Sequence, residues 1–302
     1  MRKRVSVAGA VSLLGQHLLV RLSEDRLISV ESLHDCMGGD PRTGLLDLPQ
    51  WQVAPEVARA FSHVPLLSAE APARASVLLS FLPEDGAAGI EALHLARGTR
   101  IITHCEHARL AVPLAMPGVT DIDPGATHLA TPNCTTAICA LPLQYLHTTH
   151  GVTGVTITTL QAISGTDLPG IAAHTIHDRV DGHLAGEADA LSDELSIIFD
   201  QAFPVDAFAT RVPVWRGHTI TMSVRLADNA DAIAVADTLS GVDGIAVADA
   251  PTERERFPID APLATVVSLR NSVDGVMMVL KADNLGAATT GIMQTIAHAL
   301  QV

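Results

Sequence analysis

The first thirty residues restrict the possible folds more than any other part of this sequence. Residues 4–8 form a short strand-like apolar run that ends at Gly9, residues 13–22 repeat apolar side chains at helical spacing, and residues 27–30 again resemble a strand. This order of strand, glycine-containing turn, helix and strand is that of a βαβ unit. Its helical crossover, right-handed in nearly all proteins, joins two parallel strands. The sequence therefore predicts a parallel sheet near the N-terminus.

The alternation of strands and helices continues beyond this unit. Residues 75–82 and 100–103 are apolar and strand-like, and residues 87–96 between them have the spacing of an amphipathic helix. Regular alternation of this kind is typical of an α/β domain with helices packed on a parallel sheet.

A second domain is predicted after Pro132. It contains a helix over residues 134–147, a strand over 152–160, an acidic helix near 191–201, and strand-like segments at 213–226, 261–269 and 275–281. Turn-rich segments separate the later strands, as in a mixed or antiparallel sheet. We predict domains at 1–132 and 133–284, a C-terminal helix at 285–302 that packs back on the first domain, and a mobile excursion at 227–252.

Composition limits the class of partner. The chain has 302 residues, 48% of them hydrophobic and 17% charged, so nearly all of it can pack into cores. The formal net charge of −14 argues against a nucleic acid or an anionic membrane and favours a small-molecule ligand. No apolar stretch approaches the roughly 20 residues that span a bilayer. We expect a cytoplasmic protein with reduced cysteines.

One of the four cysteines stands at the predicted start of a helix. Cys134 follows Pro132 and Asn133 and precedes an apolar helical run, where free backbone amides and the helix dipole stabilise a thiolate. Such a cysteine can act as a nucleophile. Cys139 lies further along the same apolar segment and is interpreted as a core residue.

Three motifs around this cysteine resemble aspartate-semialdehyde dehydrogenase, particularly its archaeal and fungal branch. They are TPNCTTA at 131–137, TLQAISGTDLPG at 159–170 and RVPVWRGHT at 211–219, in the family's order. The resemblance implies that Cys134 is the nucleophile and Gln161 a positioning amide. It also implies that Arg211 binds the substrate carboxylate and that His218 is a general acid/base, roles that suit a guanidinium fork and an imidazole.

Weaker matches extend the implied site. Arg109 in HCEHARL corresponds to a substrate-binding arginine, Glu187 in AGEADA to an acidic residue that meets the substrate amino group, and Asn133 to a phosphate-side contact. Taken alone, Arg109 and Glu187 are equally well interpreted as solvated surface charges. The resemblance makes 1–132 a Rossmann-type dinucleotide-binding domain and 133–284 the catalytic and dimerisation domain. The implied cofactor-binding residues are Gly9, Ser12, Leu13, Leu14, Gly15, Ser164, Gly165 and Asn284.

The sequence departs from the family at the contacts for phosphate groups. The family opens with G-x-x-G-x-x-G, but Ser12 replaces the central glycine, where a side chain can hinder the pyrophosphate. The segment after the second strand contains Asp35 and Cys36 and no basic residue through Gly39, which favours NAD over NADP. Ala190 stands where the family has a phosphate-binding lysine, which favours a thioester substrate over an acyl phosphate.

We therefore expect a semialdehyde dehydrogenase-like oxidoreductase that uses NADP or NAD and converts an activated dicarboxylic or amino acid through a thioester on Cys134. Two alternatives stay open: a cofactor-independent acyl transferase or hydrolase with the same Cys/His pair, and a non-catalytic paralogue. A homodimer or homotetramer is expected from the resemblance. No metal site is predicted, because the spacing of His104, Cys105 and His107 matches no standard zinc pattern.

Overall fold

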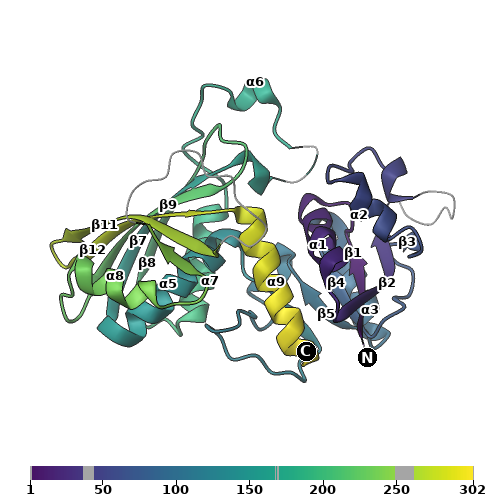
Figure 1. Cartoon of the computed structure of the whole chain (residues 1–302), viewed down its shortest axis with the longest axis horizontal. Helices are drawn as coiled ribbons and strands as arrows, with labels where there is room; N and C mark the ends of the chain where they lie inside the picture. Colours follow the sequence, from purple (N-terminus) through teal and green to yellow (C-terminus); the bar gives the residue numbers. More distant parts are fainter. Residues whose placement is uncertain (1, 37–43, 167, 169, 249–261, 302) are drawn as a thin grey trace. The chain divides into compact units, whose positions relative to one another are not determined.

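The computed structural model describes residues 2–36, 44–166, 168, 170–248 and 262–301 (Figure 1). The chain forms two compact units. The first contains residues 1–132, 167–169 and 291–302, and the second contains 133–166 and 170–290. Within the described ranges no helix is long and apolar enough to cross a membrane.

The first unit is built on a six-stranded sheet whose strand pairs are all parallel, as the βαβ opening predicted. The strand order is β3-β2-β1-β4-β5-β6. The strands are β1 (Lys3–Ala8), β2 (Ile28–Asp35), β3 (Leu66–Ser68), β4 (Val77–Ser80), β5 (Arg100–Thr103) and β6 (His128–Ala130). The order reverses between β1 and β4, which is where parallel α/β sheets bind ligands at the carboxyl ends of their strands.

Helices and a shared apolar core complete this unit. The helices are α1 (Leu13–Glu24), η1 (Leu45–Asp47), α2 (Pro55–Ala60), α3 (Glu84–Ala96) and α4 (Glu106–Arg109). The core gathers fully buried side chains such as Leu18, Leu79 and Ile102. It also contains Ile292 and Ile296 from the second half of α9 (Asn284–Leu300), so this helix supplies apolar surface to the first unit.

The second unit is built on a mixed six-stranded sheet, as the sequence predicted. Its order is β10-β11-β12-β9-β7-β8, with β7–β8 and β10–β11 parallel and the other pairs antiparallel. The strands are β7 (Val152–Gln161), β8 (Val205–Arg211), β9 (His218–Leu226), β10 (Ile245–Val247), β11 (Ala264–Ser272) and β12 (Gly275–Ala282). The helical elements are α5 (Cys134–His150), η2 (Ile163–Gly165), α6 (Ala173–Ile176), α7 (Glu187–Ile198) and α8 (Ala232–Ser240).

Three sequence-based expectations for this unit were wrong. The strand expected over 213–226 begins only at His218, because Pro213 and the positive φ of Gly217 keep the preceding residues in a loop. The excursion expected at 227–252 contains α8, which Asp231 caps, and strand β10; residues 249–252 lie outside the described part. The acidic helix starts at Glu187, four residues before the predicted position.

Two glycines shape the turn between β1 and α1. A Cβ atom on Gly9 would lie 2.1 Å from the carbonyl oxygen of Phe81, and Gly9 has φ +71°. A Cβ atom on Gly15 would lie 2.2 Å from the carbonyl oxygen of Gly9. Both contacts are with backbone atoms, so no side-chain rotation relieves them.

We expect Gly9→Ala to reduce the free energy of unfolding by at least about 2 kcal/mol, because it adds left-handed strain to a backbone overlap. Urea unfolding followed by circular dichroism measures this. The matched control is Gly89→Ala, at an exposed position of α3 with no atom within 4 Å of the new Cβ. That change should stabilise the helix by up to about 1 kcal/mol. Equal effects of the two changes would contradict the assignment of Gly9 as a steric requirement.

Candidate active site

Cys134 is the first residue of α5, and the sequence explains why the helix starts there. Asn133 has extended backbone angles, and its side-chain oxygen accepts a hydrogen bond from the Thr135 amide at 3.1 Å, which is the geometry of an N-cap. The backbone amide of Asn133 donates a hydrogen bond to the buried carboxylate of Glu194 at 2.8 Å. The Cys134 thiol is partly exposed at the positive end of the helix dipole.

His218 is the first residue of β9 and lies beside this thiol. Its Nε2 atom is 3.5 Å from Cys134 Sγ, and its Nδ1 atom accepts a hydrogen bond from the Ala162 amide at 3.0 Å. Only the lone pair of Nδ1 can accept that bond, so the neutral ring carries its proton on Nε2. Burial, with the nearby Arg211 charge as the smaller cause, lowers the His218 pKa to about 3.

The tautomer of His218 decides how the pair works. With its proton on Nε2, the ring donates toward the sulfur, while the thiol donates to Asn133 Oδ1 at 3.3 Å. Protonation of the ring would place an Nδ1 proton against the Ala162 amide proton. The geometry therefore disfavours an imidazolium beside Cys134.

Polar side chains from β7, β8 and α7 gather near the same two residues. Gln161 Nε2 donates to Glu187 Oε2 at 3.1 Å, and Asn133 Nδ2 lies 3.4 Å from the same oxygen. Arg211 pairs with Gln161 across the strands, and its guanidinium donates to the Ala162 carbonyl at 2.7 Å. Burial lowers the Arg211 pKa from its ordinary value, and Glu187 opposes that shift. The sequence-predicted residues of the second unit thus meet at one place.

Three residues expected to contact a cofactor are linked to each other or to this group. Ser164 Oγ donates to Asn284 Oδ1 at 2.7 Å, and the Gly217 amide lies 3.3 Å from the same oxygen. A Cβ atom on Gly165 would lie 3.0 Å from Arg211 Nη1 and 3.2 Å from His218 Cε1. Gly165 therefore lets η2 pack directly against these two side chains.

Sequence reasoning missed an ion pair that fixes the loop before His218. Arg216 donates to Asp283 through two bonds, Nε to Oδ1 at 2.8 Å and Nη2 to Oδ2 at 2.6 Å. Asp283 is 2% exposed and immediately precedes Asn284. The position of Arg216, two residues before His218 in the third motif, could have marked it as part of the site. Only the fold, however, reveals that its partner is Asp283.

Arg109 lies in the first unit. The sequence also allowed it to be a solvated surface charge, but its side chain is buried. It ends α4, is buried, and donates from Nη2 to the His104 carbonyl at 2.8 Å. Burial of a guanidinium is costly unless it serves structure or binding. The position of Arg109 agrees with a specific role and not with a surface charge.

The turn before α1 fits a pyrophosphate despite Ser12. Ser12 has φ −62°, so no left-handed backbone is needed there. Its hydroxyl is turned onto the loop itself, donating to the Gly9 carbonyl at 2.8 Å and accepting from the Gly15 amide at 3.1 Å. Within the described part of the chain the amides of Leu13 and Leu14 have no hydrogen-bond acceptor. These two donors at a helix N-terminus are suited to an anion.

The end of β2 carries the residues expected to choose between NAD and NADP. Asp35 is its last residue and is buried, and Cys36 follows and is exposed. His34 is held by Ser32 Oγ at 2.9 Å and lies 3.2 Å from the Ser68 carbonyl. Burial lowers the His34 pKa to about 4, so it adds no positive charge at neutral pH. Residues 37–39 of this segment lie outside the described residues.

The fold and the site together define a class: α/β proteins of two units in which a cysteine at a helix N-terminus faces a histidine that begins a strand. No family model matches the chain. The relatives described next nevertheless carry the same name. The chain is 26% identical over 287 residues to the aspartate-semialdehyde dehydrogenase of Archaeoglobus fulgidus, covering 86% of this chain and 81% of that protein. It is 28% identical over 261 residues to that of Cryptococcus neoformans, covering 74% and 70%.

Solved structures agree on the fold. The structure of the Candida albicans aspartate-semialdehyde dehydrogenase with NADP superposes with a TM-score of 0.83 at 22% identity, covering both chains completely. That of the Vibrio cholerae aspartate-semialdehyde dehydrogenase II complexed with ASA gives 0.81 at 20% identity, covering 100% of this chain and 98% of the other. The chain is similar in sequence and in fold to aspartate-semialdehyde dehydrogenases, which confirms the resemblance that its three motifs indicated.

The tautomer of His218 predicts how alkylation of Cys134 depends on pH. Without an imidazolium partner, reactivity toward iodoacetamide should fall about tenfold per pH unit below the thiol pKa, with no acid plateau. Rates should be measured between pH 4 and 9 in a Cys36→Ser background, because Cys36 is the other accessible thiol of the four. Cys134→Ser in that background reports residual labelling. A plateau that extends below pH 5 would indicate a thiolate–imidazolium pair and contradict the structure.

The same residue predicts a pH dependence of stability. Since the His218 pKa is about 3 in the folded protein and near 6.5 in the unfolded chain, protons bind preferentially to the unfolded chain as pH falls below 6.5. His218 should cost about 2 kcal/mol of unfolding free energy at pH 5 relative to neutral pH. Urea titrations at pH 7 and pH 5 should show that His218→Gln makes the loss of unfolding free energy between the two pH values smaller by about 2 kcal/mol, while the share of other buried histidines such as His34 remains. The control is His177→Gln at an exposed ring, which should leave the difference unchanged.

Proposed function

We propose that this protein is an NAD(P)-dependent semialdehyde dehydrogenase that interconverts an activated amino-dicarboxylic acid and its semialdehyde through a thioester on Cys134. The observation that carries the proposal is the Cys134–His218 contact at a helix N-terminus, with Gln161, Glu187, Asn133 and Arg211 joined around it. Two relatives that match most of this chain are named aspartate-semialdehyde dehydrogenase, which supports the proposal.

The first step is acyl transfer to sulfur. The Cys134 thiolate attacks the acyl carbon, the carbon–sulfur bond forms, and the bond to the phosphate or thiol leaving group breaks, with the electron pair departing on that group. Dipoles at the start of α5 stabilise the sulfur charge before attack. His218 Nε2–H donates a hydrogen bond to the sulfur. This bond orients the sulfur and favours its anionic form.

The second step returns the sulfur to the thiolate. A nicotinamide held by the first unit would supply the hydride in this direction. With that hydride on the carbonyl carbon, the carbon–sulfur bond would break, the electron pair would return to Cys134, and the aldehyde would leave. No net proton is needed, so a histidine that stays neutral and donates from Nε2 is sufficient throughout. The geometry therefore favours the donor part of the acid/base role that the resemblance implied for His218.

The surrounding charges suit an amino acid as substrate. Glu187 is partly exposed and held by two amide groups, which leaves its carboxylate able to accept from an ammonium group. Arg211 is buried and donates from Nη1 to the Ala162 carbonyl, and a substrate carboxylate would offset the cost of burying its charge. Arg109 on α4 is proposed as a further substrate-binding residue, as the resemblance implied.

Cofactor binding is assigned to the first unit. The amides of Leu13 and Leu14 are proposed to receive the pyrophosphate, with Gly9, Ser12 and Gly15 shaping the turn and Ser164, Gly165 and Asn284 on the nicotinamide side. Asp35 would repel a 2′-phosphate and accept from a ribose hydroxyl, so NAD is the preferred cofactor. Ala190 lacks the charge to hold a phosphate, and a thioester is the preferred activated acid.

We further propose a cytoplasmic homodimer formed through the sheet of the second unit. On one face of this sheet Phe208 of β8 and Met277 of β12 are 66% and 45% exposed. The strand register places both on the same face through Thr158, Thr221 and Val279. Large apolar side chains that are exposed on one face of a sheet support the proposal of an interface between subunits there.

The proposal is tested first by calorimetric titration with NAD and NADP, and then by nicotinamide reduction with L-aspartate semialdehyde in the presence of phosphate or coenzyme A. We expect binding of NAD to exceed that of NADP and turnover to require Cys134. Cys134→Ser should lower kcat at least about a thousandfold while leaving NAD binding intact. Succinate semialdehyde, which lacks the amino group, is the matched substrate for the Glu187 assignment.

The outcomes separate the alternatives. Failure to bind either dinucleotide would exclude hydride transfer, and acyl-enzyme formation from a thioester without cofactor would then identify an acyl transferase or hydrolase. Equal turnover of the two semialdehydes would show that Glu187 does not recognise an ammonium group. If Cys134→Ser retained both cofactor binding and turnover, a thioester on Cys134 would be excluded.

A further inference from the structure

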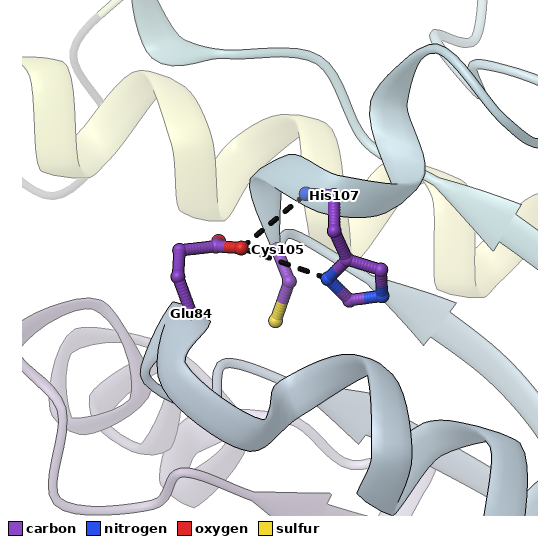
Figure 2. A group of neighbouring side chains, drawn as sticks. All are labelled: Glu84, Cys105 and His107. Carbon is purple, nitrogen blue, oxygen red and sulfur yellow. Dashed lines mark hydrogen bonds and ion pairs between the residues drawn. The ribbon is translucent and has the colours of Figure 1, made fainter.

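A second group of reactive side chains lies in the first unit, separate in sequence from the residues assigned to catalysis. Figure 2 shows Glu84 at the start of α3 with Cys105 and His107 at the start of α4. One ligand atom from each lies within 4.8 Å of the other two. His107 Nδ1 is 3.6 Å from Glu84 Oε2, and Glu84 also accepts from the amides of Glu106 and His107. These three side chains offer a carboxylate oxygen, a sulfur and an imidazole nitrogen to one point.

A buried carboxylate supports the far side of the histidine. Glu91 is 1% exposed, and its Oε2 lies 3.2 Å from His107 Nε2 and 3.3 Å from His128 Nε2. Thr103 donates to the other oxygen at 2.7 Å, which fixes the carboxylate. Among the described residues no aligned hydrogen bond reaches Glu91 Oε2, which leaves this oxygen available to the His107 ring. A metal-binding histidine characteristically directs its second ring nitrogen at a carboxylate in this way.

Charge is not balanced within the group. Among the described residues the only ion-pair partners of Glu84 and Glu91 are histidine rings, and neither carboxylate pairs with a lysine or arginine. Cys105 is buried beside them, with its thiol 3.4 Å from the Leu82 carbonyl and 3.7 Å from Ser80 Oγ. Two carboxylates and a thiol in a partly desolvated place favour a cation.

We propose that Glu84, Cys105 and His107 bind a Zn²⁺ ion, with His107 coordinating through Nδ1 and Glu91 holding its Nε2 proton. One sulfur, one nitrogen and one oxygen ligand suit zinc, whose fourth position is then filled by water. The ion joins the first turns of α3 and α4 across the carboxyl ends of β4 and β5. His104 takes no part, because its Nδ1 is bonded to Thr131 Oγ1 at 2.8 Å.

The site was not found from sequence because Glu84 is 21 residues before Cys105, which produces no zinc-binding spacing. The fold brings them together, since neighbouring parallel strands end at the same edge of the sheet. If the proposed function holds, the ion also fixes α4, which carries Arg109. The metal site itself depends only on the side chains named above.

Cobalt binding tests the proposal without reference to activity. The protein should be made without a histidine tag, freed of metal with a chelator, and titrated with Co²⁺ in a background with Cys36→Ser and Cys134→Ser, so that neither accessible thiol contributes. We expect one equivalent of Co²⁺ with thiolate-to-metal charge-transfer absorption, displaced by Zn²⁺. Cys105→Ser should abolish the absorption, and Glu91→Gln should weaken binding about 10- to 100-fold.

A surface variant guards against loss of folding. Glu84→Gln changes a side chain that is 44% exposed and should weaken binding at least about tenfold, while Glu56→Gln, at a 73% exposed carboxylate of α2, should leave binding unchanged. Circular dichroism confirms that each variant is folded. Absence of stoichiometric binding in this background, absorption that persists in Cys105→Ser, or equal effects of Glu84→Gln and Glu56→Gln would each overturn the proposal.

Discussion

The hydrogen bond from the Ala162 amide to His218 Nδ1 is the constraint on which the rest of the site depends. It fixes the ring orientation, selects the tautomer and leaves Nε2–H directed at Cys134. The acceptor is supplied by the first residue of β9 and the donor by the residue after β7, so the pairing of these two strands positions the chemistry. A backbone donor is well suited to this task, because an amide N–H does not titrate and cannot rotate away as a side chain can.

Several unrelated interactions serve this one arrangement. Arg216 and Asp283 hold the loop that delivers His218, Gly165 permits close packing against its ring, and Asn133 both caps α5 and contacts Glu187. Each is modest in energy and local in range. Together they leave the reacting groups little freedom before any substrate arrives, which is how an enzyme avoids reorganisation during the reaction.

Sequence reasoning succeeded where the signal was local. Period-two and helical patterns identified most strands and helices, and the three motifs selected Cys134, Gln161, Arg211 and His218, which the structure brings together. It failed where the deciding partner is distant. Nothing local connects Arg216 to Asp283, Glu84 to Cys105, or Ala162 to the His218 tautomer. The helix α8 was missed because Ala and Asp residues were interpreted as turn-rich, although Asp231 supplies a standard N-cap.

The helix α9 has a consequence for how the chain folds during synthesis. Residues Ile292, Ile296 and Ala299 complete the core of a unit whose other core residues come almost entirely from the first third of the chain. On the ribosome, that unit must wait with an open apolar surface while the whole second unit is made. The N-terminal part of the first unit is thus translated first, but its core is completed last. A fragment that ends at residue 132 lacks part of its own core.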